Sequence, residues 1–548
     1  TVKSINQNYY DGSTTLITSA VRKDGVTVGI PTDVNIFYPL GTIDGRTNSK
    51  STSSNWDQAA LATAQIGWQE KIYVDASYRQ DWYRPFKQFA YLGTKESYGY
   101  FGVGANAILS DIIKLPKWFD YAKYRLSYSE VGNSIPNAVY NAVSKNEGTG
   151  AVGGMQRNPF TPIPEKTKSF ETGLEMQFLR DCLTADITYY NSAMHNSYLE
   201  IASTNGLPQP VNTGIIRNQG VEISLGYDWK INNNWRWQTN VNFSYNHNKI
   251  VETYEDKFGN SKDITKDIIK GRIQQLYRKG NAYGDIYITD YTRYKNDIYV
   301  EYKTEMLPDE NNVMVEQQVP YYNQEGKGEL YHKAGDIYIT NGKPSYGGYV
   351  DLKNNKIRTY NKNRKYQKYA GNLNSPYQLS WSNTFTYKNF SLYFLINGRI
   401  GGKVISMTEA YLDKFGASER SGEARLYAEK HNLYMEDGRH AIYLNDGRDK
   451  IAVEDYYTAM GESGSEEYIY NATNFRLREL SLGYTFRNLF GDYKNLSISF
   501  VCRNLFFIYK DAPVDPDVSI STANGFGGVD IFNYPSPRSF GLNIKLNI

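Results

Sequence analysis

Residues 218–229 read NQGVEISLGYDW and residues 235–246 read WRWQTNVNFSYN, and these two stretches decide the fold class. In the first, the odd positions 221–227 are apolar, whereas Glu222, Ser224 and Asp228 are polar or charged. Alternation with a period of two places successive side chains on opposite faces of a β-strand. Both stretches are therefore predicted to be strands with one apolar face and one polar face.

The same alternation recurs at 71–81, 182–190 and 538–548. Strands of globular proteins average about 5–6 residues, whereas strands that cross a bilayer at a tilt need about 9–11. Aromatic residues, which form girdles at the membrane interfaces, supply 15% of the chain and cap many of these runs. The sequence therefore predicts an all-β protein, a transmembrane antiparallel β-barrel with its apolar face toward lipid and its polar face toward the lumen.

Short and long connections alternate between the predicted strands. Short links follow Trp68, Leu179, Trp229 and Tyr387, and a medium link runs from 486 to 494. Outer-membrane barrels have short periplasmic turns and long external loops, whereas a sandwich or propeller has no reason for this asymmetry. The predicted extracellular loops are 39–55, 82–97, 132–167, 193–217, 247–376, 400–474 and 505–537.

Counting these segments gives about 15 strands, or about 17 if the stretch 247–376 contributes a pair, whereas single-chain bacterial barrels have even numbers. The chain begins at Thr1 without an initiator Met or a signal-peptide pattern. Residues 1–548 are therefore expected to be the C-terminal portion of a larger barrel.

Composition excludes several other classes of protein. No run approaches the roughly 20 apolar residues that a membrane helix needs. The 61 basic and 58 acidic residues nearly balance, which gives no electrostatic case for a nucleic-acid partner. Cys182 and Cys502 lie far apart in predicted strands, so a disulfide framework is not expected.

Several stretches resemble the SusC-like TonB-dependent outer-membrane transporters. The matching stretches, in the family's order, are YVDASYRQDWYRPF (73–86), SYGYFGVGANAILSD (97–111), YAKYRLSYSEVGN (121–133), PIPEKTKSFETGLEMQF (162–178), IIRNQGVEISLGY (215–227), NFRLRELSLGYTF (474–486) and YPSPRSFGLNIKLNI (534–548). The resemblance implies a 22-stranded barrel in the outer membrane of a Gram-negative bacterium. It also implies an N-terminal plug and a TonB-contacting segment, neither of which is visible in this sequence.

The family resemblance further implies the partners and the activity. A SusD-like surface lipoprotein would cover the barrel, outer-membrane lipid would surround it, and the TonB complex would energise it through the missing plug and first strands. The cargo would be a large nutrient, either an oligosaccharide or a peptide. No cofactor and no catalytic residue are expected, and nucleic acid is not expected as a partner.

Two sets of residues are candidates for contact with the plug or the cargo. Polar-face residues expected to project into the lumen, where they would be solvated or bind the plug, are Asp75, Arg79, Asp81, Arg125, Glu171, Glu175, Asp186 and Glu222. Loop residues suited to stack on a sugar or a peptide are Trp82, Tyr83, Arg84, Tyr321, Tyr322, Tyr346 and Tyr349. The loop residues suit aromatic girdles or lipoprotein contacts equally well.

Motifs for metals and catalysis are weak. The five histidines His195, His247, His332, His431 and His440 lack metal-motif spacing and are expected in solvated loops. Asp511, Asp515 and Asp517 could supply oxygen ligands to Ca²⁺, but their spacing is not that of an EF-hand, and a rigid external loop is favoured.

Three functions remain open from the sequence. The favoured one is active import through the outer membrane, and the second is a passive porin or adhesin barrel without energy coupling. The third is a secreted all-β enzyme acting on glycans through a carboxylate pair such as Asp515 and Asp517, which would need to flank a cleft.

Overall fold

The structure is a computed structural model of the 548-residue chain. It describes residues 19–21, 27–29, 57–83, 86, 90, 93–134, 162–202, 208–212, 214–255, 261, 263–269, 273–294, 298–308, 314–322, 330–332, 335–340, 343–346, 348–351, 356–359, 368–445, 447, 449–463, 466–488, 495–517 and 527–547. The chain forms two compact units, 1–64 with 76–101 and 132–164, and 65–75 with 102–131 and 165–548.

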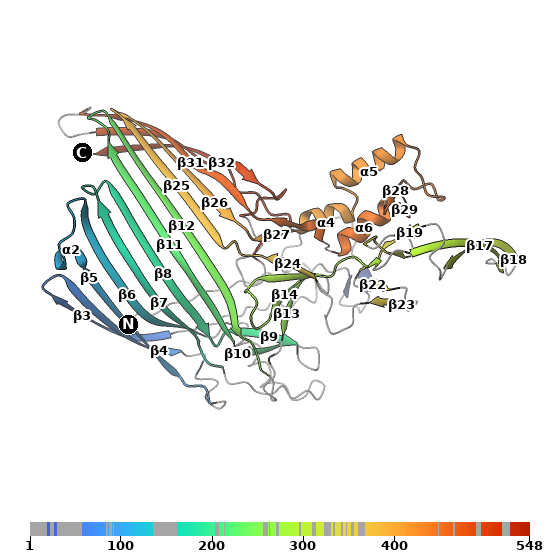
Figure 1. The fold of residues 1–548 in the computed structure, drawn as a ribbon, viewed down its shortest axis with the longest axis horizontal. Coiled ribbons are helices and arrows are strands. Elements are labelled where there is room, and N and C mark those ends of the chain that lie inside the picture. Colours follow the sequence, from blue (N-terminus) through green and yellow to red (C-terminus); the bar gives the residue numbers. More distant parts are fainter. Residues whose placement is uncertain are drawn as a thin grey trace. The chain divides into compact units, whose positions relative to one another are not determined.

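A long antiparallel sheet, whose strands follow one another in chain order, dominates the fold (Figure 1). Its 13 strands are β3 (Asp57–Trp68), β4 (Ile72–Tyr83), β5 (Ser97–Ile108), β6 (Phe119–Asn133), β7 (Glu165–Phe178), β8 (Leu183–His195), β11 (Ile215–Lys230), β12 (Trp235–Glu252), β25 (Tyr377–Tyr387), β26 (Phe390–Ile400), β31 (Asn474–Phe486), β32 (Asn495–Lys510) and β34 (Ser539–Asn547). The predicted all-β class and long-stranded antiparallel sheet are confirmed. No helix in the described residues is both long and apolar enough to cross a bilayer.

The predicted strand count corresponds to two separate sheets. The 15 predicted segments contain the 13 strands above together with β1 (Ser19–Val21) and β2 (Thr27–Gly29). Among the described residues, β1 and β2 pair with each other and not with the long sheet. The alternative of an extra pair from 247–376 is wrong for the described residues. The strands found in that stretch form small sheets of their own.

The strands β7, β8, β11, β12 and β25 of the long sheet each present one polar and one apolar face. Across the ladder, Ser224 lies between Asp186 and Asn242, and Asn242 also pairs with Ser380. One residue further along, Ile223 pairs with Ile187 and Phe243, and Phe243 pairs with Leu379. Since strand side chains alternate, these two rows face opposite sides of the sheet.

The described part of the chain leaves the apolar face uncovered. Val221, Ile223 and Phe243 are partly exposed, and Leu542 is 64% exposed. A soluble protein rarely leaves so many large apolar side chains in one exposed sheet face, whereas a barrel presents them to hydrocarbon. The apolar face therefore matches the lipid-facing side of the predicted barrel.

Tight turns join the strands at one end of the sheet. The backbone has positive φ at Gln69 (50°), Glu70 (58°), Arg180 (59°), Asp181 (62°) and Lys388 (50°). Hairpin turns with positive φ at their central residues match the right-handed twist of the flanking strands. These turns lie at the short links predicted from the sequence. A short helix, α2 (Leu109–Ile112), occurs in the connection between β5 and β6 and was not predicted.

The strands extend further into the predicted loops than the sequence suggested. β12 reaches Glu252, β6 reaches Asn133, β8 reaches His195 and β32 reaches Lys510. Beyond the hydrocarbon layer the outward face no longer needs apolar residues, so the alternation fades while the hydrogen-bonded ladder continues. Residues 39–55 and 135–161 lie outside the described residues.

The remaining long connections of the second unit contain secondary structure of their own. The elements within 193–376 are β9 (Tyr198–Ala202), β10 (Pro208–Asn212), β13 (Ile264–Ile269), β14 (Ile273–Tyr277), β15 (Asp285–Ile288), β16 (Arg293–Tyr294), β17 (Ile298–Pro308), β18 (Met314–Tyr322), β19 (Leu330–His332), β20 (Ile339–Thr340), β21 (Lys343–Pro344), β22 (Gly348–Asp351), β23 (Lys356–Thr359) and β24 (Lys368–Asn372). Those within 400–537 are β27 (Lys403–Ser406), α4 (Met407–Lys414), α5 (Glu419–Lys430), β28 (Ala441–Leu444), β29 (Asp449–Ala452), α6 (Val453–Ser463), η3 (Glu466–Tyr468), β30 (Ile469–Asn471) and β33 (Val529–Asp530).

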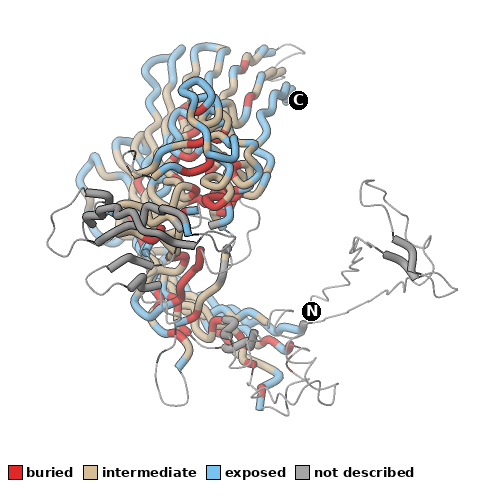
Figure 2. The backbone as a smooth tube through the Cα atoms, turned by 90° about the vertical axis from the view of Figure 1, so that its right-hand side faces the viewer, coloured by how far each residue is buried: buried red, intermediate tan, exposed pale blue. Residues whose placement is uncertain are grey.

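These connections pack together through a core of their own. Ile273, Ile286, Ile405, Tyr468 and Val529, which come from three different connections, are buried in one cluster. Much of the buried backbone, red in Figure 2, lies in this layer, while the turn ends of the strands are exposed. The helices α4, α5 and α6 in this layer correct the expectation of an irregular polar loop at 400–474.

Candidate functional site

A hollow of about 680 Å³ opens on the polar face of the sheet in the second unit. Its lining includes Glu222, Asn242, Ser380, Asn397, Arg399 and Arg478, which come from five neighbouring strands. Most of these side chains carry donors or acceptors because they occupy alternate positions of strands that are apolar on the opposite face. The arrangement gives a wide, hydrated polar surface that can form hydrogen bonds to a ligand at many points.

Arg125 connects the first strands at this hollow. Its Nη2 lies 2.7 Å from Oδ1 of Asp186 and 3.2 Å from Oγ1 of Thr188, and its Nη1 lies 3.5 Å from Oε2 of Glu175. Glu175 and Asp186 are directly opposite in the ladder, where like charges repel. The guanidinium offsets that repulsion, which explains how two carboxylates are tolerated side by side.

The structure places several predicted lumen-facing residues on this same face. Arg125, Asp186 and Glu222 line the hollow, and Glu171 shares a face with Glu175 because the two lie four residues apart in β7. The carboxylate of Asp75 lies directly over Gly104, so close that a Cβ there would be 2.5 Å from its Oδ2. Their contact with a plug or a cargo stays a prediction.

Arg79 and Asp81 form a separate group in the first unit. Nε of Arg79 lies 2.6 Å from Oδ1 of Asp81, and the hydroxyl of Tyr83 donates to Oδ2 of Asp81 at 2.7 Å. Asp81 is 3% and Tyr83 is 6% exposed, and Tyr83 packs edge-on against the buried Phe86. Trp82 is 40% exposed, and a cargo contact of Trp82 or Tyr83 stays a prediction.

The other predicted loop contacts are only partly described. Arg84 lies outside the described residues, and for Tyr321, Tyr322 and Tyr349 the structure describes the backbone alone. Tyr346 packs against Tyr291 with ring centroids 4.7 Å apart. A role in cargo binding stays a prediction for these residues.

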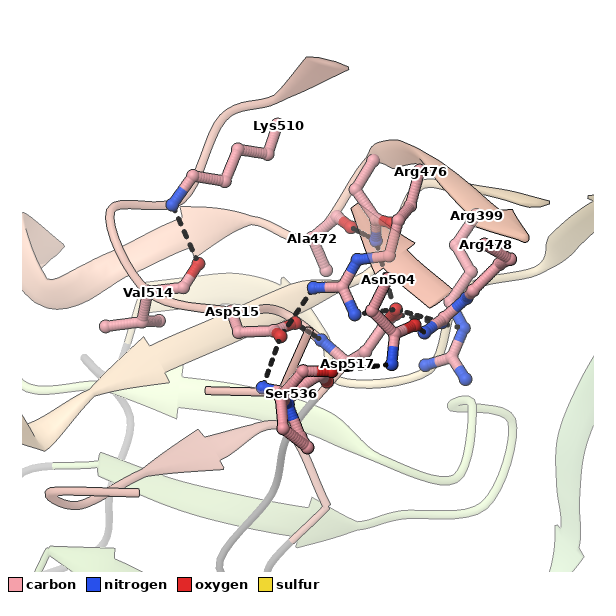
Figure 3. A network of polar contacts seen from close by, with 12 residues as sticks. Arg399, Ala472, Arg476, Arg478, Asn504, Lys510, Val514, Asp515, Asp517 and Ser536 are labelled. Atoms are coloured by element: carbon pink, nitrogen blue, oxygen red, sulfur yellow. Dashed lines mark hydrogen bonds and ion pairs between the residues drawn. The ribbon is translucent and has the colours of Figure 1, made fainter. Parts of the chain in front are cut away.

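A cluster of arginines and aspartates, missed by sequence reasoning, holds the connection after β32 against β31 (Figure 3). Nη2 of Arg476 lies 2.5 Å from Oδ2 of Asp515, Arg478 is hydrogen-bonded to Asp517, and Nε of Arg399 lies 3.5 Å from Oδ1 of Asp517. The backbone N–H groups of Ser536 and Asp517 also donate to Asp515, each at 3.1 Å. We call this group the arginine latch.

The pair at the centre of the arginine latch is buried. The side chains of Arg476 and Asp515 are 3% and 5% exposed, and the guanidinium lies 3.8 Å above the Phe507 ring. Burial by itself would raise the pKa of Asp515, but the hydrogen bonds from Arg476, Ser536 and Asp517 outweigh it and hold that pKa below its usual value. The sequence carried a signal for this cluster, since both the arginines of RLR and the aspartates of DPD are spaced two residues apart.

The contacts of Asp515 and Asp517 in the arginine latch can be compared with those that a Ca²⁺ site or a glycan-cleaving enzyme would need. Asp515 and Asp517 contact guanidinium groups, and in the described part of the chain no three His, Cys, Asp or Glu side chains group to hold a metal ion. A hydrolase of the two-carboxylate kind needs one acid whose pKa is raised, whereas the pKa of Asp515 is lowered. His195 and His247 lie in strands β8 and β12, which corrects their expected place in loops.

With this geometry established, comparison with known proteins is informative. Residues 5–272 match the family model described as the TonB-dependent receptor-like β-barrel. Over these residues the chain is similar to a TonB-dependent receptor-like barrel. The resemblance to SusC-like receptors that the sequence motifs suggested is confirmed.

Two curated relatives of the receptor-like barrel match over long stretches. TonB-dependent receptor P3 of Formosa agariphila is 23% identical over 482 residues, covering 82% of this chain and 42% of that protein. TonB-dependent receptor SusC of Bacteroides thetaiotaomicron is 22% identical over 330 residues, covering 60% of this chain and 26% of that protein.

The solved RagAB peptide transporter shares the fold at a TM-score of 0.58 and 16% identity, covering 94% of this chain and 50% of that one. A structure of the RagAB peptide importer in its closed-closed state gives a TM-score of 0.53 at 18% identity, covering 92% of this chain and 50% of that one. The chain therefore spans half or less of the length of the relatives described here.

Proposed function

We propose that this chain forms part of an outer-membrane importer that moves a large nutrient, an oligosaccharide or a peptide, into a Gram-negative bacterium. The observation that carries the proposal is the two-faced sheet, apolar and uncovered on one side and polar with a hollow of about 680 Å³ on the other. A surface of that kind suits a barrel wall between hydrocarbon and a wet passage.

The proposed partners follow from the relatives. RagAB is named a peptide transporter and SusC a TonB-dependent receptor, so the energy for import would come through TonB. A SusD-like surface lipoprotein would cover the layer of packed connections at the looped end of the sheet. The buried core of that layer supports this role, because a folded surface gives a partner a defined shape to recognise.

Energised uptake separates the importer from a passive barrel. In cells that carry the complete receptor, uptake of fluorescent oligosaccharides and peptides should require the receptor gene and should stop when a protonophore collapses the inner-membrane gradient. Uptake that survives the protonophore would instead favour a passive porin.

A matched pair of variants tests whether cargo uses the hollow. Ser380→Trp places an indole in the hollow and should strongly reduce uptake, whereas Leu542→Trp points to the opposite face and should leave uptake unchanged. Equal uptake by both variants, at equal amounts of folded barrel, would contradict a passage along the polar face.

A further inference from the structure

Three aromatic rings form an exposed ledge on the layer of packed connections. Tyr411 lies in α4, Phe415 is the residue directly after that helix, and Phe532 follows β33. The Tyr411 ring centroid lies 6.5 Å from that of Phe415 and 6.0 Å from that of Phe532, with interplanar angles of 11° and 24°. Phe415 is 73% and Phe532 60% exposed, so these nearly parallel rings present free faces to solvent.

The backbone of Phe532 is held in an unfavourable conformation to place its ring there. Its φ is +47°, in the left-handed region that side chains with a Cβ seldom adopt. The Phe532 N–H donates to Oγ1 of Thr408 at 2.6 Å, and that hydroxyl donates to Oδ2 of the buried Asp530 at 2.6 Å. A strained backbone that exposes an apolar ring gains nothing in packing, and such strain concentrates at binding positions.

The ledge adjoins a second hollow of about 480 Å³ between the helices. This hollow is lined by residues that include Lys414, Phe415, Arg425, His440, Glu454 and Thr458. The lining therefore carries cationic, anionic and neutral polar groups together, which supply both donors and acceptors. A flat apolar surface and a polar recess of mixed charge occur side by side.

The close packing of α4 against α6 fixes this geometry. A Cβ at Gly461 of α6 would lie 2.3 Å from the carbonyl oxygen of Ala410 and 2.7 Å from the amide nitrogen of Lys414, so only glycine fits. Thr458 donates its hydroxyl to the carbonyl oxygen of Lys414 at 3.3 Å. The ledge is therefore built on a rigid helix pair.

We propose that the aromatic ledge, Tyr411, Phe415 and Phe532, binds a neutral oligosaccharide by stacking its sugar rings, with hydroxyls reaching the hollow beside it. The apolar C–H face of a pyranose matches an exposed aromatic face, and its hydroxyls both donate and accept hydrogen bonds. A strongly acidic or strongly basic peptide would be bound best by side chains that all carry the opposite charge. This hollow is instead lined by both cationic and anionic side chains. The inference rests on the proposed importer function and chooses the oligosaccharide over the peptide as its cargo.

Calorimetric titration of the full-length receptor tests the ledge. The receptor is purified in lauryldimethylamine oxide, a detergent without a sugar headgroup, and titrated with maltoheptaose, xylohexaose, mannohexaose and the neutral peptide (Pro-Gly)5. At least one oligosaccharide should bind saturably, and Phe415→Ala and Phe532→Gly should each weaken it about tenfold. Tyr427→Ala removes an aromatic ring of similar exposure from α5 and should change the affinity less than about twofold.

Phe532→Gly also separates binding from folding. Glycine adopts positive φ without strain, so this variant should keep or improve the stability of the connection while losing the ring. The ledge proposal fails if no oligosaccharide binds, if both ledge variants bind as the wild type does, or if only the peptide binds and both variants lose it. If the ledge proposal fails in one of these ways while uptake remains sensitive to the protonophore, the importer function is supported and only the role of the ledge is rejected.

Discussion

Replacing Arg476 with Met should release the connection after β32 from the barrel wall. The substitution keeps a long apolar stem but leaves the carboxylate of Asp515, which is 5% exposed, without its guanidinium partner. Removing one member of a buried ion pair costs about 3–5 kcal/mol, because the remaining charge stays desolvated. Asp515 keeps the hydrogen bonds from the Ser536 and Asp517 amides, so we expect the lower end, about 3 kcal/mol.

Amide hydrogen exchange measures this release directly. The Ser536 and Asp517 amides donate to Asp515, so their protection reports whether the arginine latch is closed. A loss of about 3 kcal/mol corresponds to exchange faster by roughly 100-fold at both amides. The matched control is Arg503→Met, which removes a 62% exposed arginine paired with Glu479 at 3.1 Å and should change these amides less than about fivefold.

A double-mutant cycle measures whether Arg476 and Asp515 stabilise the connection as a pair. Asp515→Asn should cost less than Arg476→Met, because Arg476 retains the Phe507 ring and lies 3.8 Å from Asp517. The two changes together should be less harmful than their sum by about 1–3 kcal/mol. Exchange that is accelerated less than about threefold in Arg476→Met, or a coupling energy near zero, would refute the buried-pair account.

Three further predictions follow from the same contacts. Because the folded-state pKa of Asp515 is depressed, its stabilisation is complete above the ordinary value of about 4 and is lost as the pH falls through the folded-state value. Ser536 exchange, corrected for its intrinsic rate, should therefore accelerate in acid in the wild type but not in Asp515→Asn. Gly461→Ala should force α4 from α6 and destabilise that pair by about 1–3 kcal/mol, measured by protease sensitivity, whereas Gly422→Ala in α5 should be neutral or stabilising. Ile223→Arg places a charge on the apolar face and should destabilise the barrel by about 2–4 kcal/mol, measured as a lower yield of heat-modifiable barrel in lipid vesicles. Ser224→Arg lies one residue further along, on the polar face, and should fold normally.

How much was predictable differs between the sheet and the packed connections. Strands such as 218–229 and 235–246 were predictable because a period of two is a local property, visible in a dozen consecutive residues. Strand ends were predicted less well, since the alternation weakens where the outward face leaves hydrocarbon. The connection at 400–474 was taken for loop because α4 and α5 are short and only partly apolar, and their stability comes from packing.

The prediction of candidate site residues also depended on whether their arrangement is a local property of the sequence. Arg125, Asp186 and Glu222 were identified from the sequence because the polar side of an alternating strand must share one face. The burial of Tyr83 was not visible in the sequence, since it depends on the contacts of its hydroxyl with Asp81 and of its ring with Phe86.

The sequence by itself determined the two-faced sheet, its tight turns and its kinship, because each depends on residues that are neighbours in the chain. Only the tertiary structure decided which charges meet and which rings align. Arg476 and Asp515 are 39 residues apart, and Phe532 and its hydrogen-bond partner Thr408 are 124 apart. Such pairs form only when the ends of several strands bring distant connections into one layer. A local period in the sequence cannot predict which residues then come into contact.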